Sequence, residues 1–285
     1  MIIEIILAIL LGVLVGAFSG LFPGIHINLV SGFLVYYSIF LTGYFEPIVL
    51  VVAIVSLAMT HTFLDFIPSI FLGAPNEDTA MSIMPGHELL MEGRGHEAVM
   101  LSIYGCFVGI ILSLVFVPIF IFLIPIVYPF FQRMMAWILI WVVIFLVYQE
   151  KRFRLWAIFI FVLSGFLGVA SLNMGINQPL LPLLSGLFGA SALIESISQK
   201  VNLPPQRIEK FSFNKKGLLK PIFATSLIAP VCSFLPGLGS SQAAIIGSGI
   251  FKEDKALDRR QFLVLVGMIN SFVMAMSFVV IYVLA

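Results

Sequence analysis

A short block of polar residues interrupts a chain that is otherwise strongly apolar. Asn76-Glu77-Asp78-Thr79 follows the break Gly73-Ala74-Pro75, which itself follows an apolar run from Pro47 to Leu72. Adjacent carboxylates are costly in or near hydrocarbon, and a proline break frees backbone groups that need protein or water as partners. A solvated loop between two helices would account for the block. The rest of the chain favours a binding site at a broken helix, with substrate contacts from Ala74, Pro75, Asn76 and Thr79.

Two Pro-Gly pairs lie in matching surroundings and add further candidates. Pro23-Gly24 and Pro236-Gly237 each follow an apolar run and precede small or polar residues. A helix that begins at Pro-Gly has unpaired N–H groups and the positive end of its dipole there, so two such ends suit a carboxylate or phosphate. A plain kink with small residues for close packing is the simpler alternative. The neighbouring substrate-binding candidates are His26, Asn28, Gly239, Ser240, Ser241 and Gln242.

Four ionisable residues are candidates for coupling to H⁺ or Na⁺. His61 and Asp65 are four residues apart in segment 47–72 and therefore share one helix face. Ionisable residues within membrane helices usually face a cavity or a partner. A structural pair near the end of the segment is the alternative. Glu77 and Asp78 are the other two coupling candidates.

No motif predicts a metal site, a cofactor or an enzyme. His87-Glu88 and His96-Glu97 flank Gly93-Arg94-Gly95, which is typical of a solvated turn. The chain has no nucleophile elbow, phosphate-binding loop or cysteine–histidine pair, which argues against an enzyme or an ATP-driven pump. Only a coupling ion, Na⁺ or H⁺, is expected to bind besides the substrate.

Composition predicts an all-α polytopic protein of the cell membrane. The chain is 61% hydrophobic and 10% charged, with a mean hydropathy of +1.14. Its net charge of +1 and lack of a basic, aromatic-rich patch argue against a nucleic-acid partner. Basic residues cluster at Lys151–Arg154, Lys200–Lys220 and Lys252–Arg260, which predicts that these loops are cytoplasmic. The side of the N-terminus stays open, because segment 76–91 could cross, re-enter or lie flat.

The polar loop before Lys220 divides the chain into three parts. We expect a first membrane repeat with scaffold helices at 1–200, a cytoplasmic linker at 201–217 and a second, partial repeat at 218–285. Pro23 and Pro236 hold matching positions in the two halves, and paired Gly/Pro-interrupted segments point to a transporter site of broken or re-entrant helices. In this register Ala285 falls just before a partner of Gly73-Ala74-Pro75 is due. The second repeat is therefore expected to be incomplete, and a homodimer could complete the site.

Several short motifs resemble one known family, the large membrane subunit of the tripartite tricarboxylate transporters, and its short archaeal-type relatives most closely. The resemblance covers most of the chain, and the short motifs that carry it are Leu21-Phe22-Pro23-Gly24-Ile25, Gly73-Ala74-Pro75, Pro85-Gly86-His87, Glu92-Gly93-Arg94-Gly95, Ser185–Gly189 and Phe234–Gly239.

The resemblance implies secondary transport of a small carboxylate, driven by an ion gradient. Bacterial members work with a small membrane subunit and an extracytoplasmic binding protein, and whether this chain has either stays open. Where the family more often has Pro-Gly at the second break, this chain has Ala74-Pro75-Asn76-Glu77-Asp78. That acidity implies either bound cations or a substrate other than a di- or tricarboxylate.

Two other functions stay open at this point. A polyprenyl-phosphate translocase would also use broken helices in the membrane, and a helix N-terminus suits its phosphate equally well. An intramembrane enzyme acting through His61 and Asp65 is the weaker alternative, because no nucleophile motif accompanies them.

Overall fold

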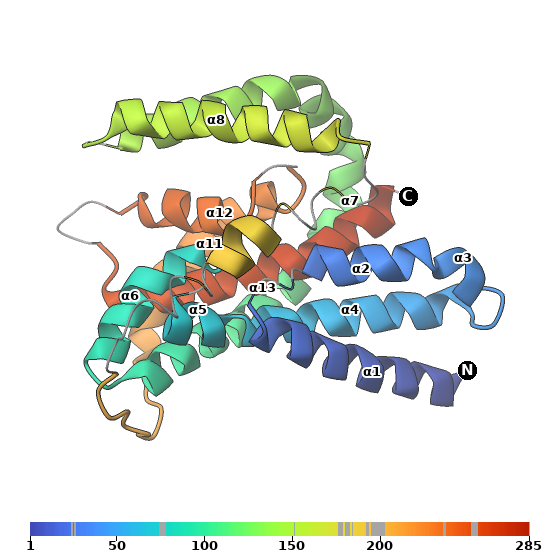
Figure 1. Ribbon diagram of the computed structural model, residues 1–285, viewed down its shortest axis with the longest axis horizontal. Coiled ribbons are helices and arrows are strands. Elements are labelled where there is room, and N and C mark those ends of the chain that lie inside the picture. The colour runs from blue at the N-terminus through green and yellow to red at the C-terminus, as the bar shows by residue number, and fades with distance from the viewer. Residues whose placement is uncertain are drawn as a thin grey trace.

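The computed structural model describes residues 1–23, 25, 27–73, 78–150, 152–175, 179, 183, 185–191, 194, 203–235, 238–251 and 256–284. Every regular element in these ranges is helical (Figure 1). The elements are α1 (Ile2–Leu21), α2 (Ile27–Tyr36), α3 (Ser38–Leu41), α4 (Pro47–Leu64), α5 (Phe66–Leu72), α6 (Ala80–Met91), α7 (Gly95–Gln149), α8 (Arg154–Leu172), the π-helical η1 (Ser185–Ala190), the 3₁₀-helical η2 (Lys215–Leu218), α11 (Leu219–Cys232), α12 (Ser240–Ser248) and α13 (Arg259–Leu284).

The chain is a multi-pass membrane protein. Five described helical segments are long and apolar enough to cross a bilayer: α1, α4 with α5, α7, α8 and α13. Their large apolar side chains, such as Phe161 and Phe166 of α8, are exposed on the outside of the bundle, as lipid-facing residues are. The all-α polytopic fold predicted from composition is confirmed.

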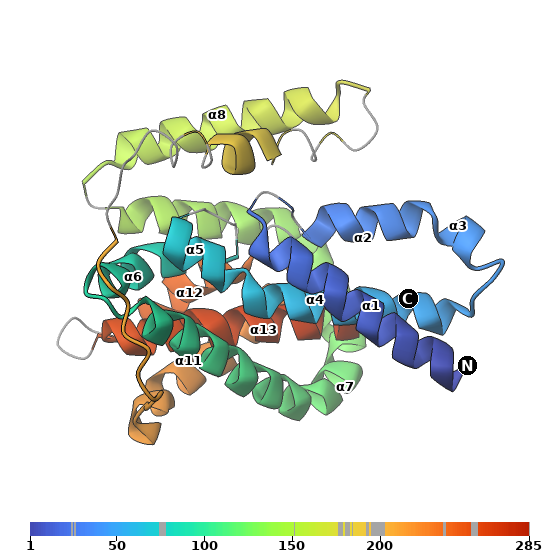
Figure 2. The ribbon, with the colours of Figure 1, turned by 60° about the horizontal axis from the view of Figure 1, so that its bottom comes forward.

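Helix α7 folds back on itself instead of running straight. Its 55 residues would extend about 80 Å as a straight helix, far more than the roughly 30 Å of a bilayer core. Pro118, Pro125 and Pro129 each remove a backbone hydrogen bond near its middle, where a bend is least costly. Figure 2 shows the helix passing along the bundle, turning and returning. The sequence predicts two spans here, 97–124 and 126–148, and α7 supplies both of them as one continuous helix.

Helix α13 lies at the centre of the bundle. In its most apolar window 61% of the residues are buried, against 6% in α8. It packs on α4, α6, α7, α11 and α12, so all parts of the chain that carry site candidates contact it or its neighbours. Its middle, Leu263 to Phe272, is buried without interruption.

Glycines allow two pairs of spans to approach closely. On α1, a Cβ added to Gly12 or Gly16 would lie 2.5 Å from a backbone oxygen of α4. Between α7 and α13, a Cβ on Gly267 would lie 2.0 Å from the Ser102 oxygen, and one on Gly105 would lie 2.2 Å from the Val264 oxygen. Small residues at such spacing let membrane helices pack backbone against backbone.

Apart from the additional short helix α3 in the first half, a similar order of elements occurs in the two halves. In each half a helix leads to a break, a short helix follows, and a long helix packs on both: α1, α2 and α4, then α11, α12 and α13. Figure 1 shows α4 and α13 running in opposite directions. This order agrees with an inverted repeat. The register of Pro23 with Pro236 stays a prediction, because Pro236 lies outside the described residues.

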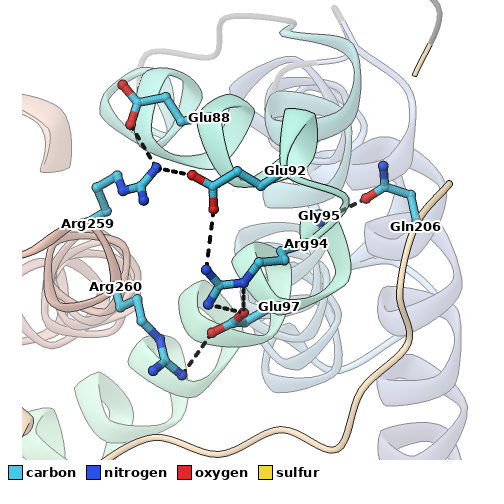
Figure 3. A network of polar contacts seen from close by, with 8 residues as sticks. All are labelled: Glu88, Glu92, Arg94, Gly95, Glu97, Gln206, Arg259 and Arg260. Carbon is cyan, nitrogen blue, oxygen red and sulfur yellow. Dashed lines mark hydrogen bonds and ion pairs between the residues drawn. The ribbon is translucent and has the colours of Figure 1, made fainter. Parts of the chain in front are cut away.

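Charged residues gather at one end of the bundle and tie α6, α7 and α13 together (Figure 3). Arg259 lies 2.7 Å from Glu92 and 3.3 Å from Glu88, and Arg260 lies 2.8 Å from Glu97. Arg94 contacts both Glu92 and Glu97, so the ion pairs form one network. The positive-inside rule predicts that this end faces the cytoplasm. Figure 1 places Met1 and the end of α13 at the opposite end.

Residues 203–214 of the predicted linker are held against this network. Gln206 accepts a hydrogen bond from the Gly95 N–H at 2.9 Å and donates to the Leu90 carbonyl at 3.1 Å. The Arg207 N–H donates to the Gly93 carbonyl at 2.8 Å. The described part of the linker is therefore a packed strap across the ends of α6 and α7. The three-part division of the chain at 200 and 217 stays a prediction.

Candidate functional site

Two breaks from opposite halves of the chain meet inside the bundle. Asp78 lies just before α6, and Ser240 is the first residue of α12. The Ser240 hydroxyl lies 2.7 Å from Asp78 Oδ1 and 3.2 Å from the Asp78 carbonyl oxygen. Ser240 is 1% exposed, so this contact lies in the protein interior. Polar residues singled out in separate parts of the sequence thus share one site.

Helices α11 (Leu219–Cys232) and α12 form a pair that begins and ends at the charged end of the bundle. Just before α11 begins, the Gly217 carbonyl of η2 accepts a hydrogen bond from Gln261 near the start of α13. After α12, Phe251 lies under the Lys220 ammonium group, 5.9 Å from nitrogen to ring centroid. The break between α11 and α12 therefore lies deep in the bundle, while both outer ends of the pair lie at the charged surface.

Asn270 of α13 completes the contact and was not among the residues singled out from the sequence. Its Oδ1 lies 3.4 Å from the Ser240 hydroxyl, and the residue is 2% exposed. Its Nδ2 is buried and has no hydrogen-bond partner among the described residues. A buried amide donor without an acceptor is costly, so it marks a place where an acceptor is expected. The available signal was the polar pair Asn270-Ser271 within an apolar span.

Asp65 is a second acidic residue, buried near Asp78. It sits between α4 and α5, is 4% exposed, and its Oδ1 has no partner among the described residues. The Asp65 carboxylate is close enough to that of Asp78 for the two to repel each other. A proton or a cation bound near Asp65 would offset the cost of burying this charge.

His61 contacts α1 through its ring. Its Nδ1 lies 2.9 Å from the Ser19 hydroxyl, and both residues are buried. His61 therefore links α4 to α1, whereas Asp65, one turn later, lies near Asp78 and Cys106. The i, i+4 spacing is present, but the described contacts of the two side chains differ.

Several candidates beside the breaks serve local hydrogen bonds. Thr79 is fully buried, and its hydroxyl lies 2.5 Å from that of Ser69 on α5. The Gly239 N–H donates to Gln242 Oε1 at 3.0 Å, which caps the start of α12. Ser241 is 7% exposed, next to Ser240. These hydrogen bonds hold in position the residues beside the two breaks, one before α6 and one before α12.

The remaining candidates fall at the edge of the described structure or outside it. Pro23 lies, half-buried, in the turn after α1. Asn28 is in the first turn of α2, but its side chain lies outside the described atoms. The other predicted contacts lie outside the described residues: Gly24, His26, Ala74, Pro75, Asn76, Glu77, Pro236 and Gly237.

The structure changes one part of the prediction that a substrate anion binds at the helix N-termini. At the start of α12 the neighbouring negative charge is the protein's own Asp78 carboxylate. Besides its bond from Ser240, it lies 3.5 Å from where a Cβ on Gly239 would be. A positive helix end thus meets a carboxylate here, as its dipole favours. An anion bound at the start of α12 would have to share or take over this position.

A cavity of about 610 Å³ borders the second break from the other end of the bundle. Its walls come from Ser233 and Leu235 beside the break, from Tyr128 of α7, and from the last part of α13, including Ser277. Three lining residues, Tyr128, Ser233 and Ser277, carry hydroxyl groups, and most of the others are apolar. The cavity offers room for a small molecule at the end of the bundle opposite the ion network.

Comparison with known sequences identifies the family. The sequence model of the tripartite tricarboxylate transporter TctA family matches residues 6–285. The chain belongs to this family. The recognition made from the Pro-Gly motifs is confirmed.

One relative supports the archaeal connection. An uncharacterized protein of Methanocaldococcus jannaschii is 32% identical over 223 residues, which are 76% of this chain and 54% of that protein. The chain thus spans about half the length of this relative. No solved structure matches the chain.

Proposed function

We propose that this TctA family chain moves a small carboxylate across the cell membrane together with H⁺ or Na⁺. The observation that carries the proposal is the presence of two unsatisfied buried atoms near the Asp78–Ser240 contact. Asn270 Nδ2 lacks an acceptor and Asp65 Oδ1 lacks a donor among the described residues. An acceptor such as a carboxylate oxygen would satisfy the first, and a proton or cation would satisfy the second.

The position of these atoms suits a secondary transporter. Broken helices from two halves meet near the middle of a membrane bundle, which is where such transporters bind substrate and coupling ion. We assign the coupling ion to Asp65 and Asp78, because their mutual repulsion falls when a positive charge binds between them. Glu77 remains a further candidate ligand from the same break.

The route to the site follows from the cavity at the second break. A substrate entering the 610 Å³ cavity between Tyr128 and Ser277 reaches Leu235 and Leu238, which flank the break. Ser240, the first residue of α12, follows Leu238 by two positions in the chain. The family's tripartite name further suggests two partners, and we propose a small membrane subunit and an extracytoplasmic binding protein that delivers substrate to this cavity.

Uptake into proteoliposomes tests the proposal. The purified chain, alone and with the two partner subunits, is given radiolabelled citrate under a Na⁺ or a proton gradient. The same vesicles are tested for exchange of a radiolabelled polyprenyl phosphate. We expect gradient-driven citrate accumulation and no lipid-phosphate exchange.

Two variants sharpen this test. Asp65→Asn removes the charge that the coupling ion offsets and should abolish accumulation. Ser164→Ala on the exposed face of α8 should transport as the unchanged chain does. Lipid-phosphate exchange without citrate uptake, or full gradient-driven uptake by Asp65→Asn, would contradict the proposed function.

A further inference from the structure

We propose that Ser240 and Asn270 bind one carboxylate of the substrate and that Asp78 occupies this position when substrate is absent. The Ser240–Asn270 subsite is the Ser240 hydroxyl, the Asn270 amide and the first turn of α12. This inference rests on the proposed function and adds a role to it. Asp78 acts as an internal competitor that the substrate must displace.

The present occupant of the subsite shows which chemistry it accepts. Asp78 Oδ1 accepts a hydrogen bond from the Ser240 hydroxyl at 2.7 Å, at the N-terminal end of α12. That oxygen is a carboxylate oxygen bound by a hydroxyl at a positive helix end. A substrate carboxylate presents the same atoms with the same charge.

Asn270 gives a second, independent indication of a ligand. The residue is 2% exposed, and its amide reaches the subsite because Oδ1 lies 3.4 Å from the Ser240 hydroxyl. Its Nδ2 has no acceptor among the described residues, although Asp78 is bound nearby. Asp78 therefore fills the subsite incompletely. A substrate carboxylate, with two oxygens and no tether to the backbone, could contact both Ser240 and Asn270.

Two carboxylates do not share the subsite without a cost. Like charges at close range in a buried site repel each other strongly. Substrate binding therefore requires Asp78 to move away or to be neutralised. Asp65 is a second acidic residue, buried near Asp78, and its Oδ1 has no hydrogen-bond partner among the described residues. A cation or proton bound there would draw Asp78 out of the subsite and favour substrate binding.

The proposed exchange between Asp78 and the substrate predicts opposite changes in citrate affinity for variants of the subsite and of Asp78. Equilibrium binding of radiolabelled citrate is measured on the purified chain in detergent. Ser240→Ala and Asn270→Ala each remove a subsite contact and should weaken binding about tenfold, the typical effect of one hydrogen bond to a charged group. Asp78→Asn removes the competing charge with almost no change in shape and should bind citrate more tightly than the unchanged chain, while losing gradient-driven transport.

Matched controls separate a specific change in citrate affinity from a general effect of altered charge or folding. Glu4→Gln makes the same change of charge at the exposed outer end of α1 and should leave citrate affinity unchanged. Thermal unfolding shows whether each variant is folded. If the unchanged chain binds citrate but Asp78→Asn binds it equally or more weakly, the competitor role is overturned and the proposed function stands. If neither the unchanged chain nor Asp78→Asn binds citrate, both proposals are overturned.

Discussion

At the scale of single residues, the account depends on a few polar atoms that the bundle buries without full partners. Asp65, Asp78, Ser240 and Asn270 come from four separate elements and gather around one contact. A soluble protein could hydrate such a cluster, but the interior of a membrane bundle offers less water. Each buried polar atom that lacks a hydrogen-bond partner therefore indicates which kind of group binds there.

His61 and Ser19 allow a structural role to be separated from coupling. Ser19→Ala removes the hydroxyl that lies 2.9 Å from His61 Nδ1 and leaves a buried ring nitrogen without that partner. We expect the free energy of unfolding to fall by about 1–3 kcal/mol. Thermal unfolding measures the loss. The ion dependence of transport should stay as it is, and a changed ion dependence would show that His61 belongs to the coupling site.

The sequence was informative about these residues only where the chemistry stands out against its neighbours. Asp65, Asp78 and Ser240 are conspicuous because they lie beside breaks or carry charge in apolar segments. Asn270 is not, because an isolated amide within a membrane helix more often serves helix packing. Only the three-dimensional contact with Ser240 brings it to the site.

At the scale of elements, close backbone packing determines how the spans hold the site. Asn270 and Gly267 lie one turn apart on α13, and a Cβ on Gly267 would lie 2.0 Å from the Ser102 oxygen of α7. The position of Asn270 therefore depends on a helix contact that has no room for a side chain.

Gly267→Ala should loosen this contact. The added methyl group forces α7 and α13 apart, and overpacking of this kind costs about 1–3 kcal/mol. We expect a lower midpoint of thermal unfolding and weaker citrate binding. Gly165→Ala on α8, where a Cβ would meet nothing within 4 Å, is the matched control and should unfold as the unchanged chain does. Equal midpoints for both variants would argue against the close contact.

The hydrophobic pattern predicts spans well and their connections poorly. Apolar length was enough to indicate α1, α4 with α5, α8 and α13. It could not show that 97–124 and 126–148 form one helix, because prolines can either end a helix or bend it. It also could not show that residues 203–214 pack as a strap, since that depends on Gln206 meeting the far ends of α6 and α7.

At the scale of the whole molecule, the cytoplasmic ion network joins the two halves. Arg259 and Arg260 belong to the second half, and their carboxylate partners on α6 and α7 belong to the first. Transport by rocking of one half against the other would have to strain or break these pairs. The network at the charged end and the Asp78–Ser240 contact in the interior therefore both join residues of the first half to residues of the second half.

This network makes stability depend on acidity. The side-chain hydrogen bond from Arg259, followed by attraction to Arg259 and Arg94, lowers the pKa of Glu92 from its ordinary value of 4.5. A carboxyl group whose pKa is lower in the folded state stabilises the fold above its ordinary pKa, and that stability is lost as the pH falls through the folded value.

We therefore expect the melting temperature to fall as the pH drops below about 4.5, with a smaller fall in Glu92→Gln. Glu4→Gln serves as the control, because no described ion pair of Glu4 links the two halves of the chain. The interpretation is contradicted if Glu92→Gln and the unchanged chain show the same pH dependence.

The central claim is that substrate binds where the two breaks meet, and protection of a single thiol tests it most directly. Cys106 and Cys232 are replaced by alanine, Ser241 is replaced by cysteine, and the rate of labelling by a small thiol reagent is measured with and without citrate. Ser164→Cys on α8 is the control. The account predicts that citrate slows labelling at position 241 several-fold and leaves position 164 unchanged. Equal labelling rates at position 241 with and without saturating citrate would contradict it.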